Sequence, residues 1–272
     1  LIWEHDYIRS FRGRFGVQGM HQGNIYREKF FIPNYRNRTI GFFAIERFVR
    51  SHYELEAGLR YDYKKLESFF YRSGVLQRPE LNFSNLSYQL GGVYKPTELF
   101  KLNLNLASGW RSPSVNELYS DGLHHGVGAI ERGDAALKSE TCLNASGMAV
   151  FEHKGFYAAF SAYAYRFDNF IYYLPAPLPE LTIRGAFPVF NYRQDDANIN
   201  GADLQLSQKI GKYITIKGKA MWVRGTNKNT GEPLIYMPSD RYEARLVLNS
   251  KNTAKFTGNY FELVYQFVDR QK

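Results

Sequence analysis

The connections between the predicted strands of this chain alternate strictly between short and long. An outer-membrane β-barrel has short periplasmic turns and longer extracellular loops, whereas nothing forces a soluble sandwich to sort its loops by length. The short connections fall near Ser10–Arg12, Arg50–His52, Lys95–Glu98, Glu152–Gly155, Lys209–Lys212 and Ser250–Thr253. The long ones fall near Gly23–Arg38, Lys64–Leu81, Arg111–Lys138, Pro175–Phe187 and Gly225–Met237. The pattern predicts an all-β, antiparallel transmembrane β-barrel, with short turns on one rim and long loops on the other.

The predicted strands have one apolar and one polar face, because successive side chains of a strand point to opposite sides. Tyr53–Tyr63, for example, alternates Tyr, Leu and Ala with Glu, Gly, Arg and Asp. A soluble antiparallel sheet would alternate in the same way around its core. Strand length favours the membrane, since crossing a bilayer takes roughly 9–11 residues and the common soluble strand has roughly 5–6. Stretches of the longer kind are His52–Tyr63, Leu99–Gly109 and Tyr213–Arg224.

The composition agrees with this class and argues against several others. Aromatic residues make up 17 % of the chain, as expected where aromatic girdles line both membrane interfaces. The net charge is +9, but Lys and Arg are spread over strands and loops, so we expect no nucleic-acid partner. Cys142 is the only cysteine, so an intrachain disulfide is excluded. We interpret Cys142 as a small residue on a sheet face. We find no zinc spacing, phosphate-binding Gly loop or GxSxG elbow, and expect no catalytic residue and no cofactor.

The segment from Trp110 to Thr141 carries the most specific motifs. It reads WRSPSVNELYSDGLHHG and then VGAIERGDAALKSET. It resembles TonB-dependent outer-membrane receptors, in which a strand ends in an aromatic-Arg-Ala-Pro box followed by Glu-Leu, and an Asn-Pro-x-Leu-x-x-Glu box starts the next strand. Tyr165–Tyr172 and Asn191–Leu204 also look like the family. The matching residues are Trp110, Arg111, Pro113, Glu117, Leu118, Leu137 and Glu140, with Ser112, Asp134 and Ala135 departing from the boxes.

The resemblance implies that residues 1–272 form one partial β-barrel domain. The family's barrel has about 22 strands around an N-terminal plug, whereas we count about twelve strands here and see neither a plug nor a TonB-contacting segment. We therefore expect a fragment from the second half of the barrel, with TonB contacted through the missing N-terminal region. Its first and last strands, near Leu1–Ser10 and Lys255–Asp269, should not pair with each other.

A pair of histidines in the long Arg111–Lys138 connection is our candidate ligand site. Imidazole is the commonest protein metal ligand and also binds haem iron, so His124 and His125 are predicted metal ligands, with Tyr119 and Glu131 as nearby oxygen donors. Adjacent side chains of an extended chain point apart, so one His alone reaches a ligand. The alternative is that the pair hydrogen-bonds within the loop and packs it. Receptors for haem in the resembled family use a His between the same two boxes. Asn116–Tyr119 is predicted to form a helical turn.

The resemblance implies an active-transport receptor in the Gram-negative bacterial cell outer membrane. Such a receptor binds an iron-siderophore, haem or metal chelate, and the TonB system supplies the energy for its import. The barrel would contact outer-membrane lipid and do no covalent chemistry. Three alternatives stay open: a passive porin, an outer-membrane enzyme, and a soluble β-rich binding module.

Overall fold

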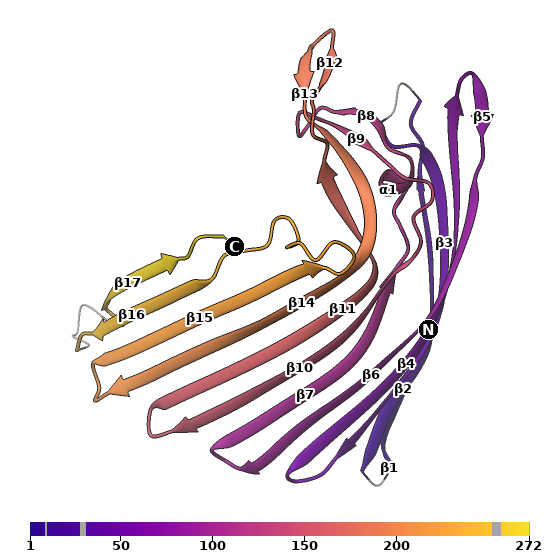
Figure 1. The fold of residues 1–272 in the computed structure, drawn as a ribbon. Coiled ribbons are helices and arrows are strands. Elements are labelled where there is room, and N and C mark those ends of the chain that lie inside the picture. Colours follow the sequence, from indigo (N-terminus) through magenta and orange to yellow (C-terminus); the bar gives the residue numbers. More distant parts are fainter. Residues whose placement is uncertain (9, 28–30, 252–256, 272) are drawn as a thin grey trace.

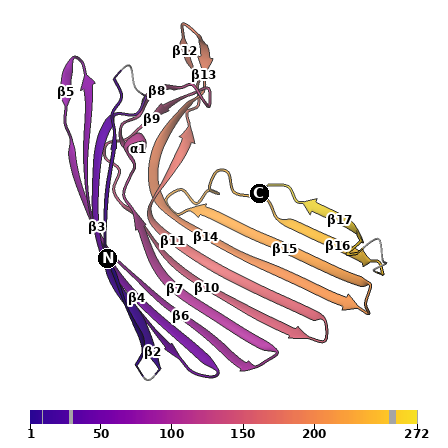
Figure 2. The same ribbon diagram turned by 180° about the vertical axis from the view of Figure 1, so that it is seen from behind.

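The computed structural model describes residues 1–8, 10–27, 31–251 and 257–271 of the chain. Its main feature is a single antiparallel sheet of long strands that curves into an open trough (Figures 1 and 2). Twelve strands of the described part follow one another across this sheet. They are β1 (Ile2–Ile8), β2 (Phe11–Asn24), β3 (Asn34–Val49), β4 (Tyr53–Arg72), β6 (Glu80–Thr97), β7 (Phe100–Arg111), β10 (Glu140–His153), β11 (Phe156–Pro175), β14 (Val189–Ile210), β15 (Ile214–Asn227), β16 (Arg241–Asn249) and β17 (Tyr260–Val268).

The short and long connections lie on opposite rims, as predicted. The turns that join β3 to β4, β6 to β7, β10 to β11 and β14 to β15 lie at the lower end of the sheet in Figure 1. The upper end carries the short elements α1 (Val115–Tyr119), β5 (Val75–Gln77), β8 (Asp121–His124), β9 (Ala129–Arg132), β12 (Glu180–Thr182) and β13 (Gly185–Phe187). The predicted turn at Ser250–Thr253 falls partly on residues 252–256, which lie outside the described residues.

The long connection predicted at Lys64–Leu81 is mostly strand. β4 continues to Arg72, and the chain turns at Ser73 and Gly74, both at positive φ, into β5, which pairs back onto β4. The strands are accordingly longer than the minimum for a bilayer, with 20 residues in β4 and 22 in β14. The residues beyond the predicted end of β4 are largely polar, so the alternation pattern did not predict that the strand continues. A strand that has left the membrane no longer needs an apolar face.

The edges of the sheet do not meet. β1 pairs only with β2, and β17 only with β16, within the described residues. Figure 2 shows the wide gap between the two ends from behind. The expected open sheet of about twelve strands is therefore confirmed.

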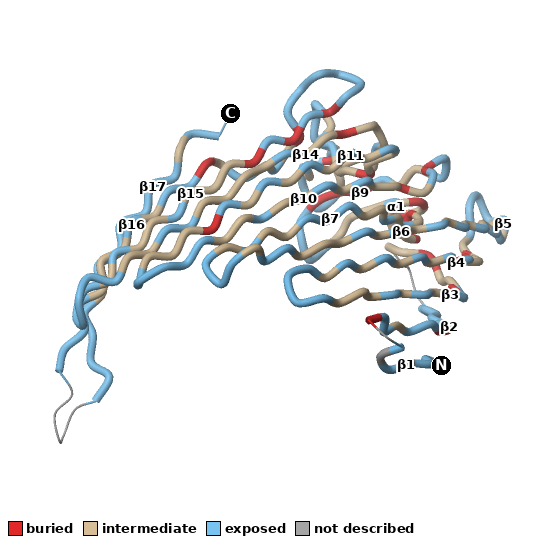
Figure 3. Tube along the Cα trace, turned by 90° about the horizontal axis from the view of Figure 1, so that it is seen from below, coloured by how far each residue is buried: buried red, intermediate tan, exposed pale blue. Residues whose placement is uncertain are grey.

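The apolar face of the sheet points outward, which is the inverse of a soluble protein. Leu59 and Leu86 are 52 % and 56 % exposed, whereas Asp62 on the opposite face is 6 % exposed. Figure 3 shows exposed and partly buried residues alternating along the strands. Ile214 and Ile216 are exposed too, and no described helix or second sheet covers them. An outer face of this kind suits lipid and removes the soluble module from the alternatives.

In the part of the chain that the structure describes, no helix combines the length and the apolar character needed to cross a membrane. A cluster of buried apolar residues lies at the long-loop end of the sheet. Leu66 of β4, Val115 and Leu118 of α1, Leu137, and Ile171 of β11 form it.

Candidate functional site

The candidate site is built on the connection between β7 and β10, residues 112–139, which we call the insert. It contains α1, β8 and β9 and lies between the upper parts of β4 and β14 in Figure 1. Pro113 is almost fully buried where the chain leaves β7. The helical turn predicted at Asn116–Tyr119 is present as α1, and Glu117 accepts a hydrogen bond from the backbone N–H of Ser114 (2.7 Å). This local capping bond starts the helix.

Arg111 joins the insert to both flanking strands. Its guanidinium donates to both carboxylate oxygens of Glu117 (2.9 Å each) and to both of Glu140 (3.2 and 3.1 Å). Glu140 also accepts the backbone N–H of Ile171 (2.7 Å). The side chains of Glu117 and Glu140 are only 12 % and 11 % exposed. These paired, charge-assisted bonds are the strong kind, so three of the family-motif residues form one clamp.

Other motif residues bury the insert against the wall. Leu118 is 1 % exposed and Leu137 is 6 % exposed, and both pack in the cluster with Leu66. Lys64 of β4 donates to the hydroxyl of Ser112 (2.6 Å). Trp110 lies on the outer face of β7, the same face as Leu104 and Leu106, and takes no part in the clamp. We therefore assign the motif residues other than Trp110 to holding the insert in place.

His124 is oriented by Glu131. Its Nδ1 lies 2.7 Å from Oε1 of Glu131, which is 7 % exposed, and its ring stacks on Phe31 at 4.8 Å. In a neutral imidazole with this bond, Nδ1 carries the proton, because a carboxylate accepts, and Nε2 has the lone pair. A Cβ at Gly126 would lie 3.6 Å from Nε2, at ordinary van der Waals distance, and the His124 side chain is 44 % exposed. The other carboxylate oxygen of Glu131 accepts from the Tyr192 hydroxyl (3.4 Å).

The four predicted ligand-site residues do not converge. His125 is exposed in the turn after β8. Tyr119 packs on the ring of Phe70 (5.1 Å), and burial raises the pKa of its hydroxyl. Among the described residues no group of three His, Cys, Asp or Glu is placed to hold a metal ion. The structure therefore brings together only His124 and Glu131.

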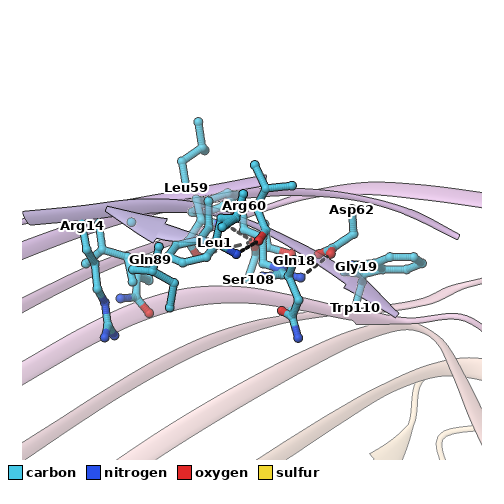
Figure 4. A pocket seen from close by; sticks show the side chains of 18 residues that line it. Leu1, Arg14, Gln18, Gly19, Leu59, Arg60, Asp62, Gln89, Ser108 and Trp110 are labelled. Atoms are coloured by element: carbon cyan, nitrogen blue, oxygen red, sulfur yellow. Dashed lines mark hydrogen bonds and ion pairs between the residues drawn. The ribbon is translucent and has the colours of Figure 1, made fainter. Parts of the chain in front are cut away.

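The inner wall of the trough carries a second polar feature. Arg60 and Asp62 of β4 form a two-bond ion pair (2.7 and 2.5 Å) beside Gly41, where any side chain would collide with both. Together with Arg14, Gln18 and Gln89, this pair lines a hollow of about 890 Å³. Figure 4 shows these side chains. Strand alternation alone predicts this polar lining.

Sequence reasoning missed Lys64, Phe31 and Tyr192 as neighbours of the insert. Lys64 could have been predicted as a neighbour, because alternation places it on the same face as Asp62. Phe31 and Tyr192 carry no such signal, since they meet His124 and Glu131 across 93 and 61 residues of chain.

Comparisons with known proteins agree with this architecture. A family model described as TonB dependent receptor-like, beta-barrel matches residues 4–272. An iron-regulated outer membrane virulence protein of Vibrio cholerae (El Tor Inaba N16961) is 24 % identical over 247 residues, covering 85 % of this chain and 35 % of the relative. The chain thus spans about a third of the length of this curated relative.

Solved structures share the fold at low sequence identity. The copper transporter OprC is 15 % identical with a TM-score of 0.72, covering 91 % of this chain and 40 % of that one. The hemophore receptor HasR of Serratia marcescens, in complex with its hemophore and heme, is 16 % identical with a TM-score of 0.67, covering 92 % and 48 %. The FrpB iron transporter of Neisseria meningitidis is 15 % identical with a TM-score of 0.64, covering 92 % and 39 %.

Proposed function

This chain belongs to the TonB-dependent receptor-like β-barrel family, and we propose on that premise that it serves the energised import of a scarce ligand. It is an outer-membrane β-barrel chain of the Gram-negative type. The ligand is an iron-siderophore, haem or another metal chelate, and the energy comes from the TonB complex. The observation that carries the proposal is the family match across nearly the whole chain.

The alternatives rank below this proposal. Members of the family are receptors and transporters rather than enzymes, which argues against an outer-membrane enzyme. The same family match argues against a passive porin. Relatives and structural neighbours named for iron regulation, iron, copper and heme support a metal-bearing cargo.

Import should depend on energy from the inner membrane. Cells that carry the full-length protein, starved of iron and given radioactive iron as haem or ferric citrate, should accumulate the label faster than cells without it. Uptake should stop when the TonB system is deleted or a protonophore collapses the proton gradient. A passive porin predicts the same uptake with and without TonB.

We place the cargo contact at His124. A metal-ligating His usually gives its other ring N–H to a carboxylate, which fixes the ring and its tautomer, and the bond from Nδ1 to Glu131 has this form. The open Nε2 is then the ligand atom for an iron or metal carried in the cargo. His125 lacks such a partner among the described residues and is the weaker candidate.

Changing His124 to Ala should weaken the binding of haem, titrated into the full-length receptor at neutral pH, by at least about tenfold. Loss of an orienting partner typically costs about 10- to 100-fold, so Glu131→Gln should also weaken binding. His125→Ala is the matched control and should bind almost normally. Unchanged affinity in the His124→Ala/His125→Ala double variant would mean that the two histidines only pack the loop. It would favour a siderophore cargo that is bound without His coordination.

A further inference from the structure

Five aromatic rings follow one another along β11, the strand that runs from the short-turn rim to the long-loop rim (Figure 1). Successive ring centroids lie 5.7, 6.1, 5.1 and 6.3 Å apart. At about 3.3 Å per residue, the row is about 30 Å long, which is roughly the thickness of the hydrocarbon core of a bilayer. We call these residues the aromatic ladder: Tyr163, Tyr165, Phe167, Phe170 and Tyr172.

The lower three rings of the ladder face the inside of the trough and not the lipid. Strand register pairs Ala162 with Gly147, and Gly147 with Leu104, which is 57 % exposed on the outer face. Directly paired residues share a face, and successive residues of a strand alternate between faces. The rings from Tyr163 to Phe167 therefore lie on the inner wall. An aromatic girdle faces outward to the membrane interfaces, so the ladder needs another explanation.

A β-bulge keeps the upper rings in the same row. Two residues of β11, Asp168 and Asn169, lie opposite one residue of β14, Asp196. The extra residue shifts the alternation by one position, so Phe170 and Tyr172 continue the row instead of passing to the other face. Asn169 has a φ of 59°, and its backbone N–H donates to Oδ1 of Asp196 (3.1 Å). The ladder thus depends on a specific local structure and not on alternation alone.

Both ends of the ladder are held by contacts with β14. The hydroxyl of Tyr172 donates to Oδ2 of Asp195 (2.6 Å). At the other end, Tyr163 lies against the backbone of Gly201, where a Cβ would be 2.3 Å from atoms of the Tyr163 side chain. The absence of a side chain at Gly201 therefore makes room for this ring. The inner rings Tyr165 and Phe167 lie between two fixed neighbours.

We propose that the aromatic ladder is a track along which the cargo passes through the barrel, and that this cargo carries a flat aromatic group. The proposal rests on the proposed import function and deepens it. The ladder passes the insert at its bulge, because Asn169 donates to the backbone carbonyl of Ser139 (3.4 Å). A cargo released from His124 would therefore leave the insert beside the ladder.

Aromatic rings suit such a track for two reasons. They attract the rings of a ligand in offset-stacked or edge-to-face contacts. Each contact is weak, and passage through a membrane protein requires several sites that a ligand can both enter and leave. The ladder should accordingly affect the rate of import, whereas His124 affects the affinity at the mouth.

The uptake rate tests the ladder separately from binding. The probes are haem and ferric catechol, which carry flat rings, and ferric citrate, which carries none. Cells with the full-length receptor would receive each probe, labelled with radioactive iron, over a range of concentrations. In Tyr165→Ala/Phe167→Ala the maximal uptake rate of a ring-bearing probe should fall about tenfold, equivalent to about 1.4 kcal/mol. The affinity of the purified variant for the same probe should be unchanged.

Three further variants separate stacking from packing. Phe160→Ala/Tyr61→Ala removes two rings from the outer face, where they are 48 % and 44 % exposed, and should import normally. Tyr165→Phe/Phe167→Tyr keeps both rings and should retain the wild-type rate. Tyr165→Leu/Phe167→Leu keeps apolar bulk without a ring and should remain slow.

The proposal is overturned if the Ala variant of the ladder imports a ring-bearing probe at the wild-type rate, or if the outer-face control loses as much. It is also overturned if the Leu variant restores the rate, since the rings would then only pack the wall. Uptake of ferric citrate alone by the wild type would overturn the ladder and leave the import function standing. TonB-dependent uptake of none of the three probes would overturn both.

Discussion

Replacing Arg111 by Ala should release the insert from the barrel wall. The change leaves Glu117 and Glu140 as two poorly exposed carboxylates without their cation. Breaking a buried pair by removing one partner costs about 3–5 kcal/mol. Because the Arg111 side chain is 41 % exposed, we expect about 2–3 kcal/mol of docking free energy to be lost. Hydrogen exchange of the full-length receptor should show residues 112–139 opening much faster, with ligand binding weakened in parallel.

The control for this change is another arginine of the same wall. Arg166 pairs with Asp168 at 3.7 Å, and their side chains are 64 % and 53 % exposed. Exposed pairs contribute about 0–1 kcal/mol, so Arg166→Ala should leave the exchange of the insert unchanged. Arg111→Lys keeps the charge but loses the paired geometry and should fall between. Equal exchange in Arg111→Ala and wild type would show that the apolar cluster alone holds the insert.

Leu118→Ala should destabilise the insert by a comparable amount through a different force. Leu118 is 1 % exposed in the cluster that joins α1 to β4 and β11. Truncating a buried Leu to Ala costs about 2–5 kcal/mol, from lost burial and the cavity left behind. Proteolysis of the folded receptor should then cut within residues 112–139 at a much lower protease concentration.

Val127→Ala serves as the control in the same segment. Val127 is 63 % exposed at the tip between β8 and β9, so truncation leaves no cavity and should change the cleavage pattern little. If Leu118→Ala resists protease as well as Val127→Ala does, α1 is not held by this cluster. The Arg111 clamp would then be the main attachment.

The sequence predicted the features that repeat along the chain. Alternation places Leu59 and Asp62 on opposite faces, and turn positions sort the connections to two rims. Both depend on neighbours within a few residues, which is why they can be predicted without a structure. The same holds for α1, whose start is set by the local bond from Ser114 to Glu117.

The contacts that make the candidate site were not predictable in the same way. Arg111, Glu117 and Glu140 stood out as motif residues, yet their joint clamp became visible only in the structure. The sequence did not distinguish the two histidines. In the structure, Glu131 contacts His124 and not His125. Likewise, β4 continues beyond its predicted end because β3 and β6 pair with it as far as Phe69 and Glu67, and β5 folds back onto its last three residues.

By itself, then, the sequence determined the repeating architecture of this chain: an antiparallel sheet with an outward apolar face and sorted rims. Strand alternation and turn formation are short-range, so the local order of residues is sufficient for both. The tertiary structure decided how the insert is anchored and which histidine is oriented. These depend on register and on contacts between residues far apart in the chain, where each partner is specified only by the packing of the others.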